Sequence, residues 1–305
     1  MAQLGSALRS GRRGRRFKSC HPDASKGLGC APGPLVVFRY VTAGAVSRQL
    51  HYAAVPVVGV SAPLLRREAS RSHKGSLWHP WVMDSPLPAE TAALSPEDAV
   101  DFWDQRHREK GDGSSGGSVS LGEQGNHAFY AIRAGQLLDL AGGSSARAPM
   151  DVLDAGCGKG IFARAMTESG YRVTAFDPSE AAITHCQRLA RLGDRENYSV
   201  ATMTSFRPTR LFDLVYAIDV LFHIMNDGEW EDSVRTLCGW VRFGGRIALV
   251  DSDHQQARQW ARYQKTRPPQ SYGEIFADCG FEVIGSHPCG PKGFPNRFNI
   301  ARRVR

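Results

Sequence analysis

The sequence predicts an α/β fold in which a mostly parallel sheet carries helices on both faces. Two observations support this prediction. From about residue 150 onward, apolar stretches of strand length alternate with stretches of helical composition, which is typical of a doubly wound parallel sheet. A glycine-rich turn at residues 156–160 joins the first strand of this series to its first helix. Ligands of parallel sheets bind beyond the carboxyl ends of the strands, so we expect a binding site at this turn.

The elements follow one another in regular order. Val152 and Leu153 supply the first strand, and a helix is expected over residues 161–169, because the glycines before it allow a sharp change of chain direction. A turn is expected at residues 243–246, where two glycines follow a helical stretch. The other strands are expected at residues 171–177, 198–202, 212–219, 246–251, 281–286 and 298–304, and the other helices at residues 179–192, 227–241 and 272–278.

The stretch Val152-Leu-Asp-Ala-Gly-Cys-Gly-Lys-Gly160 resembles the first motif of the class I S-adenosylmethionine-dependent methyltransferases, an apolar strand followed by D-x-G-x-G-x-G. The resemblance covers about residues 122–305. It implies a Rossmann-like fold with a seven-stranded, mostly parallel sheet, helices on both faces and a C-terminal antiparallel hairpin. It also implies S-adenosylmethionine as the cofactor and transfer of a methyl group to an acceptor.

A dinucleotide-binding turn is the first alternative. Its fingerprint, G-x-G-x-x-G, would place the third glycine at position 161, where this chain has Ile161. Asp154 precedes the first glycine by two residues and suits a cationic amino-acid cofactor better than a pyrophosphate, because like charges repel each other. An NAD-type oxidoreductase and a non-catalytic methyltransferase-like binding module are the two alternatives that we keep.

Further residues are expected to contact the cofactor. Asp177 ends the second strand, 21 residues past Gly156, and would accept hydrogen bonds from both ribose hydroxyls or cap the helix that follows. Thr202 stands where the family carries an acid toward adenine, and Met203 would pack against the purine or in the core. The complete expected set of cofactor-binding residues is Asp154, Gly156, Cys157, Gly158, Gly160, Asp177, Pro178, Thr202, Met203, Asp219, Tyr130 and Arg133.

Three residues are candidates for a general base, which methyl transfer needs only when the acceptor must lose a proton. Asp219 and His223 belong to a block that resembles the fourth motif of the family, beside the methionine part of the cofactor. His254 follows the fifth strand within Asp251-Ser-Asp-His254. This cluster does not match the Asp-Asn pair of the cation-dependent O-methyltransferases, so we expect no metal.

The region before the methyltransferase-like domain, residues 83–121, is expected to form a helical cap and a loop rich in Gly and Ser. Ser95-Pro-Glu-Asp98 resembles a capping box at the start of a helix that carries Phe102, Trp103 and His107. Tyr130 and Arg133 lie one helical turn apart on the next expected helix, so they can face the same site.

Residues 1–82 differ from the rest of the chain in composition. They carry 13 Lys or Arg and 2 Asp or Glu, whereas residues 83–305 carry 25 and 28. Residues 14–20 can be encoded as GGT CGC AGG TTC AAA TCC TGT, which contains the T-arm sequence of a tRNA gene. We therefore expect residues 1–82 to be a non-native or disordered leader from a mis-assigned start, with a transit peptide as the alternative.

The composition also limits the classes of molecule that this chain is expected to bind. Residues 83–305 are slightly acidic and lack a dense stripe of Lys and Arg, so we do not expect nucleic acid. No apolar stretch is long enough for a membrane span. The five cysteines of this region form no C-x-x-C pair, which suits reduced thiols in the cytoplasm. The expected acceptor is an oxygen or nitrogen nucleophile of a small molecule or a glycan, and the oligomeric state is left open.

Overall fold

The computed structural model describes residues 92–118, 121–142, 149–290 and 294–305. The chain divides into two units, residues 1–73 and 74–305, and all of the described residues lie in the second unit. The leader expected at residues 1–82 therefore lies outside the described residues.

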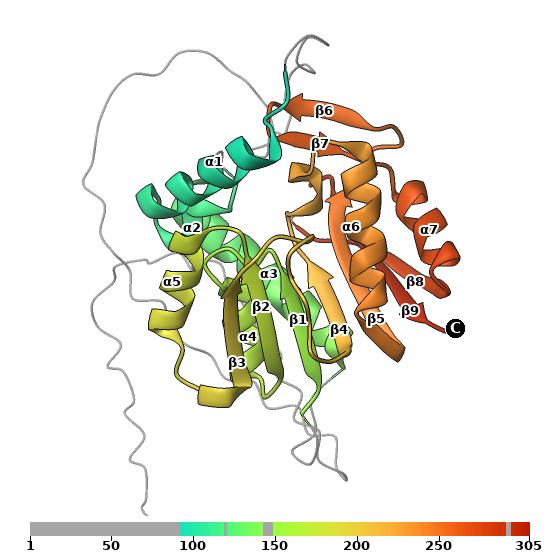
Figure 1. The fold of residues 1–305 in the computed structure, drawn as a ribbon, viewed down its shortest axis with the longest axis horizontal. Helices are drawn as coiled ribbons and strands as arrows, with labels where there is room; N and C mark the ends of the chain where they lie inside the picture. Colours follow the sequence, from blue (N-terminus) through green and yellow to red (C-terminus); the bar gives the residue numbers. More distant parts are fainter. Residues whose placement is uncertain (1–91, 119–120, 143–148, 291–293) are drawn as a thin grey trace, which may run out of the picture. The chain divides into compact units, whose positions relative to one another are not determined.

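A seven-stranded sheet forms the centre of the described region (Figure 1). Its first five strands are parallel to one another, and β9 is antiparallel to both of its neighbours. The predicted mostly parallel sheet with a C-terminal antiparallel hairpin is confirmed. The strands, in their spatial order, are β3 (Glu196–Val200), β2 (Arg172–Asp177), β1 (Asp151–Ala155), β4 (Phe212–Ala217), β5 (Val241–Ser252), β9 (Asn296–Arg303) and β8 (Phe281–Pro288).

Side chains alternate between the two faces of the sheet, as the period of a strand requires. Val152 and Leu214 belong to one buried cluster, and Leu153 and Val215 belong to the other. Because both faces are covered, the central strands are apolar on both sides. Helices α3 (Gly122–Ala141), α4 (Ile161–Glu168) and α5 (Glu180–Leu189) contribute to the first cluster, and α6 (Asp227–Gly239) and α7 (Pro269–Asp278) contribute to the second.

The order of the strands reverses between β1 and β4, which run parallel side by side. The connections that follow these two strands leave toward opposite faces of the sheet, so a crevice for a ligand opens between the connections, beyond the carboxyl ends of the strands. Helix α1 (Pro96–Glu109) and the short α2 (Asp112–Ser115) lie at this edge (Figure 1). The Ser95 side chain caps α1 by accepting a hydrogen bond from the Asp98 backbone, as the capping-box resemblance predicts.

Three features differ from the predicted elements. A two-stranded hairpin, β6 (Arg258–Ala261) and β7 (Gln264–Thr266), was not expected, because strands this short show no clear alternation. Strand β5 already begins at Val241, and the glycines expected to form a turn lie within it, where the register with β4 shifts. The Gly/Ser stretch contains α2. None of the described helices is long and apolar enough to cross a membrane.

Candidate functional site

The glycine-rich turn follows β1 at the reversal of strand order. Gly156, Gly158 and Gly160 have φ angles of 77°, 49° and 71°, a left-handed conformation that other residues adopt at a cost. A Cβ atom at Gly156 would lie 2.5 Å from the Val220 side chain, and one at Gly160 would lie 2.8 Å from the Cys186 sulfur. The turn therefore requires glycine both for its backbone and for its close neighbours.

Asp177 closes the turn from the end of β2. Its Oδ2 accepts a hydrogen bond from the Gly158 backbone at 2.8 Å, and its Oδ1 accepts one from the Ser179 backbone at 2.9 Å. A carboxylate has about four acceptor positions, so two remain for a ligand. Burial raises the pKa of Asp177 to about 6, while the two backbone hydrogen bonds act in the opposite direction.

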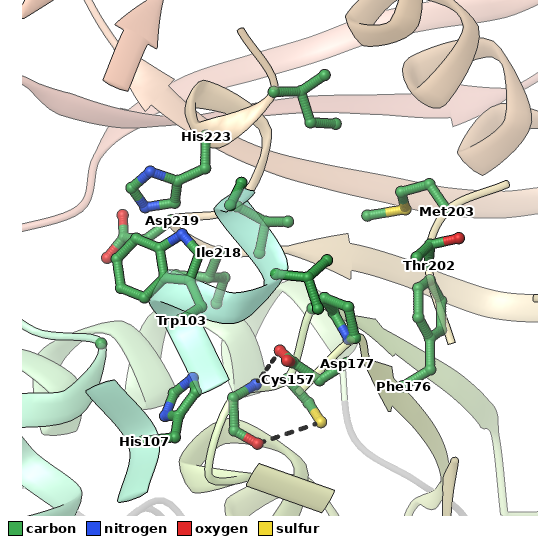
Figure 2. Close-up of a pocket in the computed structure, with 18 of the residues that line it drawn as sticks. Trp103, His107, Cys157, Phe176, Asp177, Thr202, Met203, Ile218, Asp219 and His223 are labelled. Carbon is green, nitrogen blue, oxygen red and sulfur yellow. Dashed lines mark hydrogen bonds between the residues drawn. The ribbon is translucent and has the colours of Figure 1, made fainter. Parts of the chain in front are cut away.

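A cavity of about 650 Å³ extends from this turn across the carboxyl ends of β1, β2 and β4. Ten of the residues expected from the sequence line it, namely Tyr130, Gly156, Cys157, Gly158, Asp177, Pro178, Thr202, Met203, Asp219 and His223. Figure 2 shows Trp103, Asp219 and His223 on one side of the cavity, Phe176, Thr202 and Met203 on the other, and Cys157 and Asp177 between them.

Asp154 and Gly160 support the turn without lining the cavity. Asp154 is 1% exposed and accepts a hydrogen bond from the Tyr216 hydroxyl at 3.0 Å. Burial raises the pKa of Asp154 to about 7, and the hydrogen bonds from the Tyr216 hydroxyl and, to a smaller extent, from the Ala163 backbone in the first turn of α4 partly offset this rise. Asp154 therefore joins β1 to β4 and α4 beneath the turn, outside the lining of the cavity.

Arg133 also lies behind the cavity wall. Its side chain is fully buried, forms an ion pair with Asp219 and donates a hydrogen bond from Nε to the Cys289 carbonyl at 2.9 Å. Its guanidinium lies 3.8 Å from the centre of the Phe129 ring. Arg133 is thus placed to hold Asp219, whereas Tyr130, one turn earlier on the same helix, reaches the cavity.

Asp219 has an unusual backbone. Its φ of 59° is the only positive value among the non-glycine residues that the structure describes. Such conformations cost free energy, and they persist where surrounding contacts determine them. Here Arg133 binds one carboxylate oxygen, and the Asn296 amide donates to the other at 3.3 Å. These contacts present the Asp219 carboxylate at the cavity wall just after β4.

His223 follows β4 in a short helix, η3 (Leu221–His223). Its Nδ1 lies 2.6 Å from the Tyr263 carbonyl oxygen. A carbonyl can only accept, so Nδ1 carries the proton and Nε2 of the neutral ring has a free lone pair. Burial lowers the pKa of His223 to about 4, so the ring is neutral at pH 7. Its ring centre lies 4.4 Å from that of Trp103.

His254 is placed elsewhere. It does not line the cavity, and its ring packs on Trp260 of the hairpin, with ring centres 4.9 Å apart. Asp251, from the same sequence cluster, is buried and accepts a hydrogen bond from the Tyr272 hydroxyl at 2.7 Å. Within the described ranges, no group of three or more His, Cys, Asp or Glu residues could hold a metal ion.

Helix α1 contributes cavity residues that were not predicted as site residues. Trp103 and His107, four residues apart, both line the cavity, and His107 lies 3.3 Å from where a Cβ on Gly158 would be. The Asp104 carboxylate fixes α1 by accepting hydrogen bonds from the Ser179 hydroxyl and the Ala181 backbone. The helical spacing of Trp103 and His107 is the signal that could have indicated a shared face.

The methyltransferase domain family matches residues 126–285. The chain belongs to this family. A methyltransferase for ubiquinone biosynthesis from Rickettsia canadensis is 31% identical over 153 residues, which are 44% of this chain and 63% of that relative. The match therefore spans less than two thirds of the length of that relative.

Solved structures show the same fold. The magnesium protoporphyrin IX methyltransferase from Synechocystis has a TM-score of 0.55 at 20% identity, covering 70% of this chain and 100% of that chain. The N-methyltransferase NodS from Bradyrhizobium japonicum has a TM-score of 0.54 at 16% identity, covering 68% of this chain and 99% of that chain. The predicted family and fold, those of the class I S-adenosylmethionine-dependent methyltransferases, are confirmed.

Proposed function

We propose that this chain transfers a methyl group from S-adenosylmethionine to an oxygen or nitrogen atom of a small molecule or glycan. The observation that supports the proposal is that one cavity, at the reversal of strand order, is shared by the residues of both sides. It is lined by the glycine turn and Asp177 on the cofactor side and by Asp219 and His223 beyond β4. The five described cysteines are free thiols, which supports a cytoplasmic enzyme.

The residues present fit this cofactor. Asp177 has two acceptor positions for the two ribose hydroxyls, and the glycines leave the turn without side chains where the methionine part would pass. Met203 and Phe176 offer apolar surface for adenine. The Thr202 hydroxyl is bonded to those of Thr204 and Ser205, so we assign Thr202 a place in the adenine wall without a hydrogen bond from its hydroxyl to the base.

S-adenosylmethionine would supply an electrophilic methyl group, which is bound to its sulfonium. The leaving group, S-adenosylhomocysteine, is a neutral thioether. The chain therefore has to align the acceptor and exclude water. Trp103 and Ile218 line the side of the cavity that holds Asp219 and His223 (Figure 2), and their apolar surfaces exclude water from it. For a hydroxyl acceptor, Nε2 of His223 takes the proton, and the Tyr263 carbonyl stabilises the resulting imidazolium through Nδ1. The Asp219 carboxylate accepts a hydrogen bond from the acceptor.

A thermal-shift screen with S-adenosylmethionine, S-adenosylhomocysteine and NAD tests the proposal. A ligand that binds the folded state at 100 times its Kd stabilises that state by about 2.7 kcal/mol. We expect both sulfur compounds, at saturating concentration, to raise the Tm by several degrees and NAD to leave it unchanged. A response to NAD alone would instead support the oxidoreductase alternative.

A further inference from the structure

We propose that the acceptor carries no negative charge on the part that enters the cavity. This inference rests on the proposed function and narrows its substrate class. Four carboxylates line the cavity, those of Asp112, Asp177, Asp219 and Glu229. Among the described lining residues, the one side chain with a permanent positive charge is Lys159. A cavity of this composition repels anions and offers them few partners.

Lys159 is already engaged. Its Nζ donates a hydrogen bond to the Lys110 carbonyl at 2.6 Å and lies 3.5 Å from an Asp112 carboxylate oxygen. Its side chain is 9% exposed. To reach an acceptor anion, Lys159 would have to leave both partners and release the contact between the glycine turn and the segment that joins α1 to α2.

The other charged groups at the cavity do not give it a net positive charge. Arg133 neutralises Asp219 from behind the wall. The net positive charge of S-adenosylmethionine would offset Asp177, whereas S-adenosylhomocysteine has no net charge and would leave the cavity more negative. Glu229, which is exposed on α6, has no ion pair within the part of the chain that the structure describes. Burial lowers the pKa of both His107 and His223 to about 4, so neither ring is cationic at pH 7.

The other lining side chains of the cavity are uncharged, and many of them are apolar. Leu94, Val100 and Trp103 line it from α1 and the segment before it, and Ile224 and Met225 line it after η3. A phosphate or carboxylate placed against these side chains would lose water without gaining a hydrogen-bonding cation. The geometry therefore selects uncharged or cationic hydroxyl and amine compounds and excludes phosphorylated and carboxylated ones.

A charge-balanced fragment library tests this inference on the full chain saturated with S-adenosylhomocysteine. Ligand-observed NMR at pH 7 would compare equal numbers of neutral, cationic and anionic hydroxyl or amine fragments. We expect neutral and cationic fragments to be found as hits about tenfold more often than anionic ones. Equal hit rates, or no hits of any charge, would overturn the inference. Failure to bind S-adenosylhomocysteine, measured first, would instead count against the proposed function.

A matched pair of variants sharpens the test. Glu229→Lys places a cation at the cavity, whereas Asp232→Lys makes the same charge change on an exposed side chain of the same helix that does not line the cavity. We expect Glu229→Lys to raise the affinity for anionic fragments about tenfold and Asp232→Lys to leave it unchanged. Equal responses of the two variants would contradict the role assigned to the cavity charge.

Discussion

Asp177 combines two backbone hydrogen bonds with a pKa raised to about 6 by burial. The ionised carboxylate accepts hydrogen bonds from two hydroxyls, whereas the protonated form has lost acceptor capacity. The affinity for S-adenosylhomocysteine should therefore be full above about pH 7 and should fall by about tenfold for each pH unit below about 6. Calorimetric titrations between pH 5 and pH 8 would measure this dependence.

Asp177→Asn is the control for this pH dependence. The variant should bind S-adenosylhomocysteine more weakly at pH 7, and its affinity should vary little with pH. A pH dependence that remains in the variant would point instead to Asp154, whose pKa burial raises to about 7.

His223 is expected to act on the proton of a hydroxyl acceptor and not on the cofactor. His223→Gln should lower kcat for such an acceptor by about a hundredfold or more, the usual effect of losing a general base. The Kd of S-adenosylhomocysteine should stay within about twofold, since the proposed cofactor contacts are unchanged. His254→Gln, outside the cavity, is the matched control. Equal losses in both variants would contradict the assignment.

The glycine turn and Arg133 differ in how far the sequence predicts their positions. The residues of the glycine turn could be predicted because neighbours in the chain build the turn directly. Arg133 was expected to contact the cofactor, but packing turns its guanidinium onto Asp219 and the Cys289 carbonyl. That orientation depends on a residue 156 positions later in the chain, which no local pattern encodes.

At the scale of elements, the hairpin β6–β7 supplies an interaction that spacing alone does not predict. The Tyr263 carbonyl, between its two strands, fixes the tautomer of His223. The Tyr263 ring stacks on Phe102 of α1, with centres 5.0 Å apart, and the Arg262 carbonyl accepts from the Leu94 backbone. The hairpin thus connects α1 to the proposed base. The parallel strands were easier to predict, since each is a continuous apolar run between turns.

A buried network joins β5, α6 and α7. The Tyr272 hydroxyl donates to Asp251 at 2.7 Å and accepts from Trp230 Nε1 at 3.2 Å. Tyr272→Phe removes the hydroxyl and leaves Asp251 and Trp230 without this hydrogen-bonding partner. The substitution should therefore lower the free energy of unfolding by about 1–3 kcal/mol. Urea unfolding would measure the change. The control is Tyr263→Phe, because no described residue bonds that hydroxyl, and an equal loss there would contradict the network's role.

The same network predicts a pH dependence of stability. Burial raises the pKa of Asp251 to about 7, above its usual value of 3.8, so folding favours the protonated form. The stability that this carboxyl contributes is fully present below pH 3.8 and is lost as the pH rises through 7. The Tyr272 hydroxyl lowers that pKa by stabilising the ionised form. The decrease in the free energy of unfolding caused by Tyr272→Phe should therefore be larger at pH 8 than at pH 5. A smaller decrease at pH 8 would contradict this explanation.

At the scale of the described domain, two apolar clusters on opposite faces fix the sheet, and the reversal of strand order between β1 and β4 fixes the place of the cavity. The same alternation of strands and helices that predicts the fold also predicts where a ligand binds. The acceptor side was harder to predict, because α1, η3 and the hairpin meet there only after folding.

The central claim is that the cavity holds S-adenosylmethionine through Asp177. Isothermal titration of S-adenosylmethionine into the wild-type chain and into Asp177→Ala at pH 7 tests it most directly. We expect one binding site in the wild type and no measurable binding in the variant, while the circular dichroism of the two proteins stays the same. Unchanged affinity in Asp177→Ala, or no binding to the folded wild type, would contradict the claim.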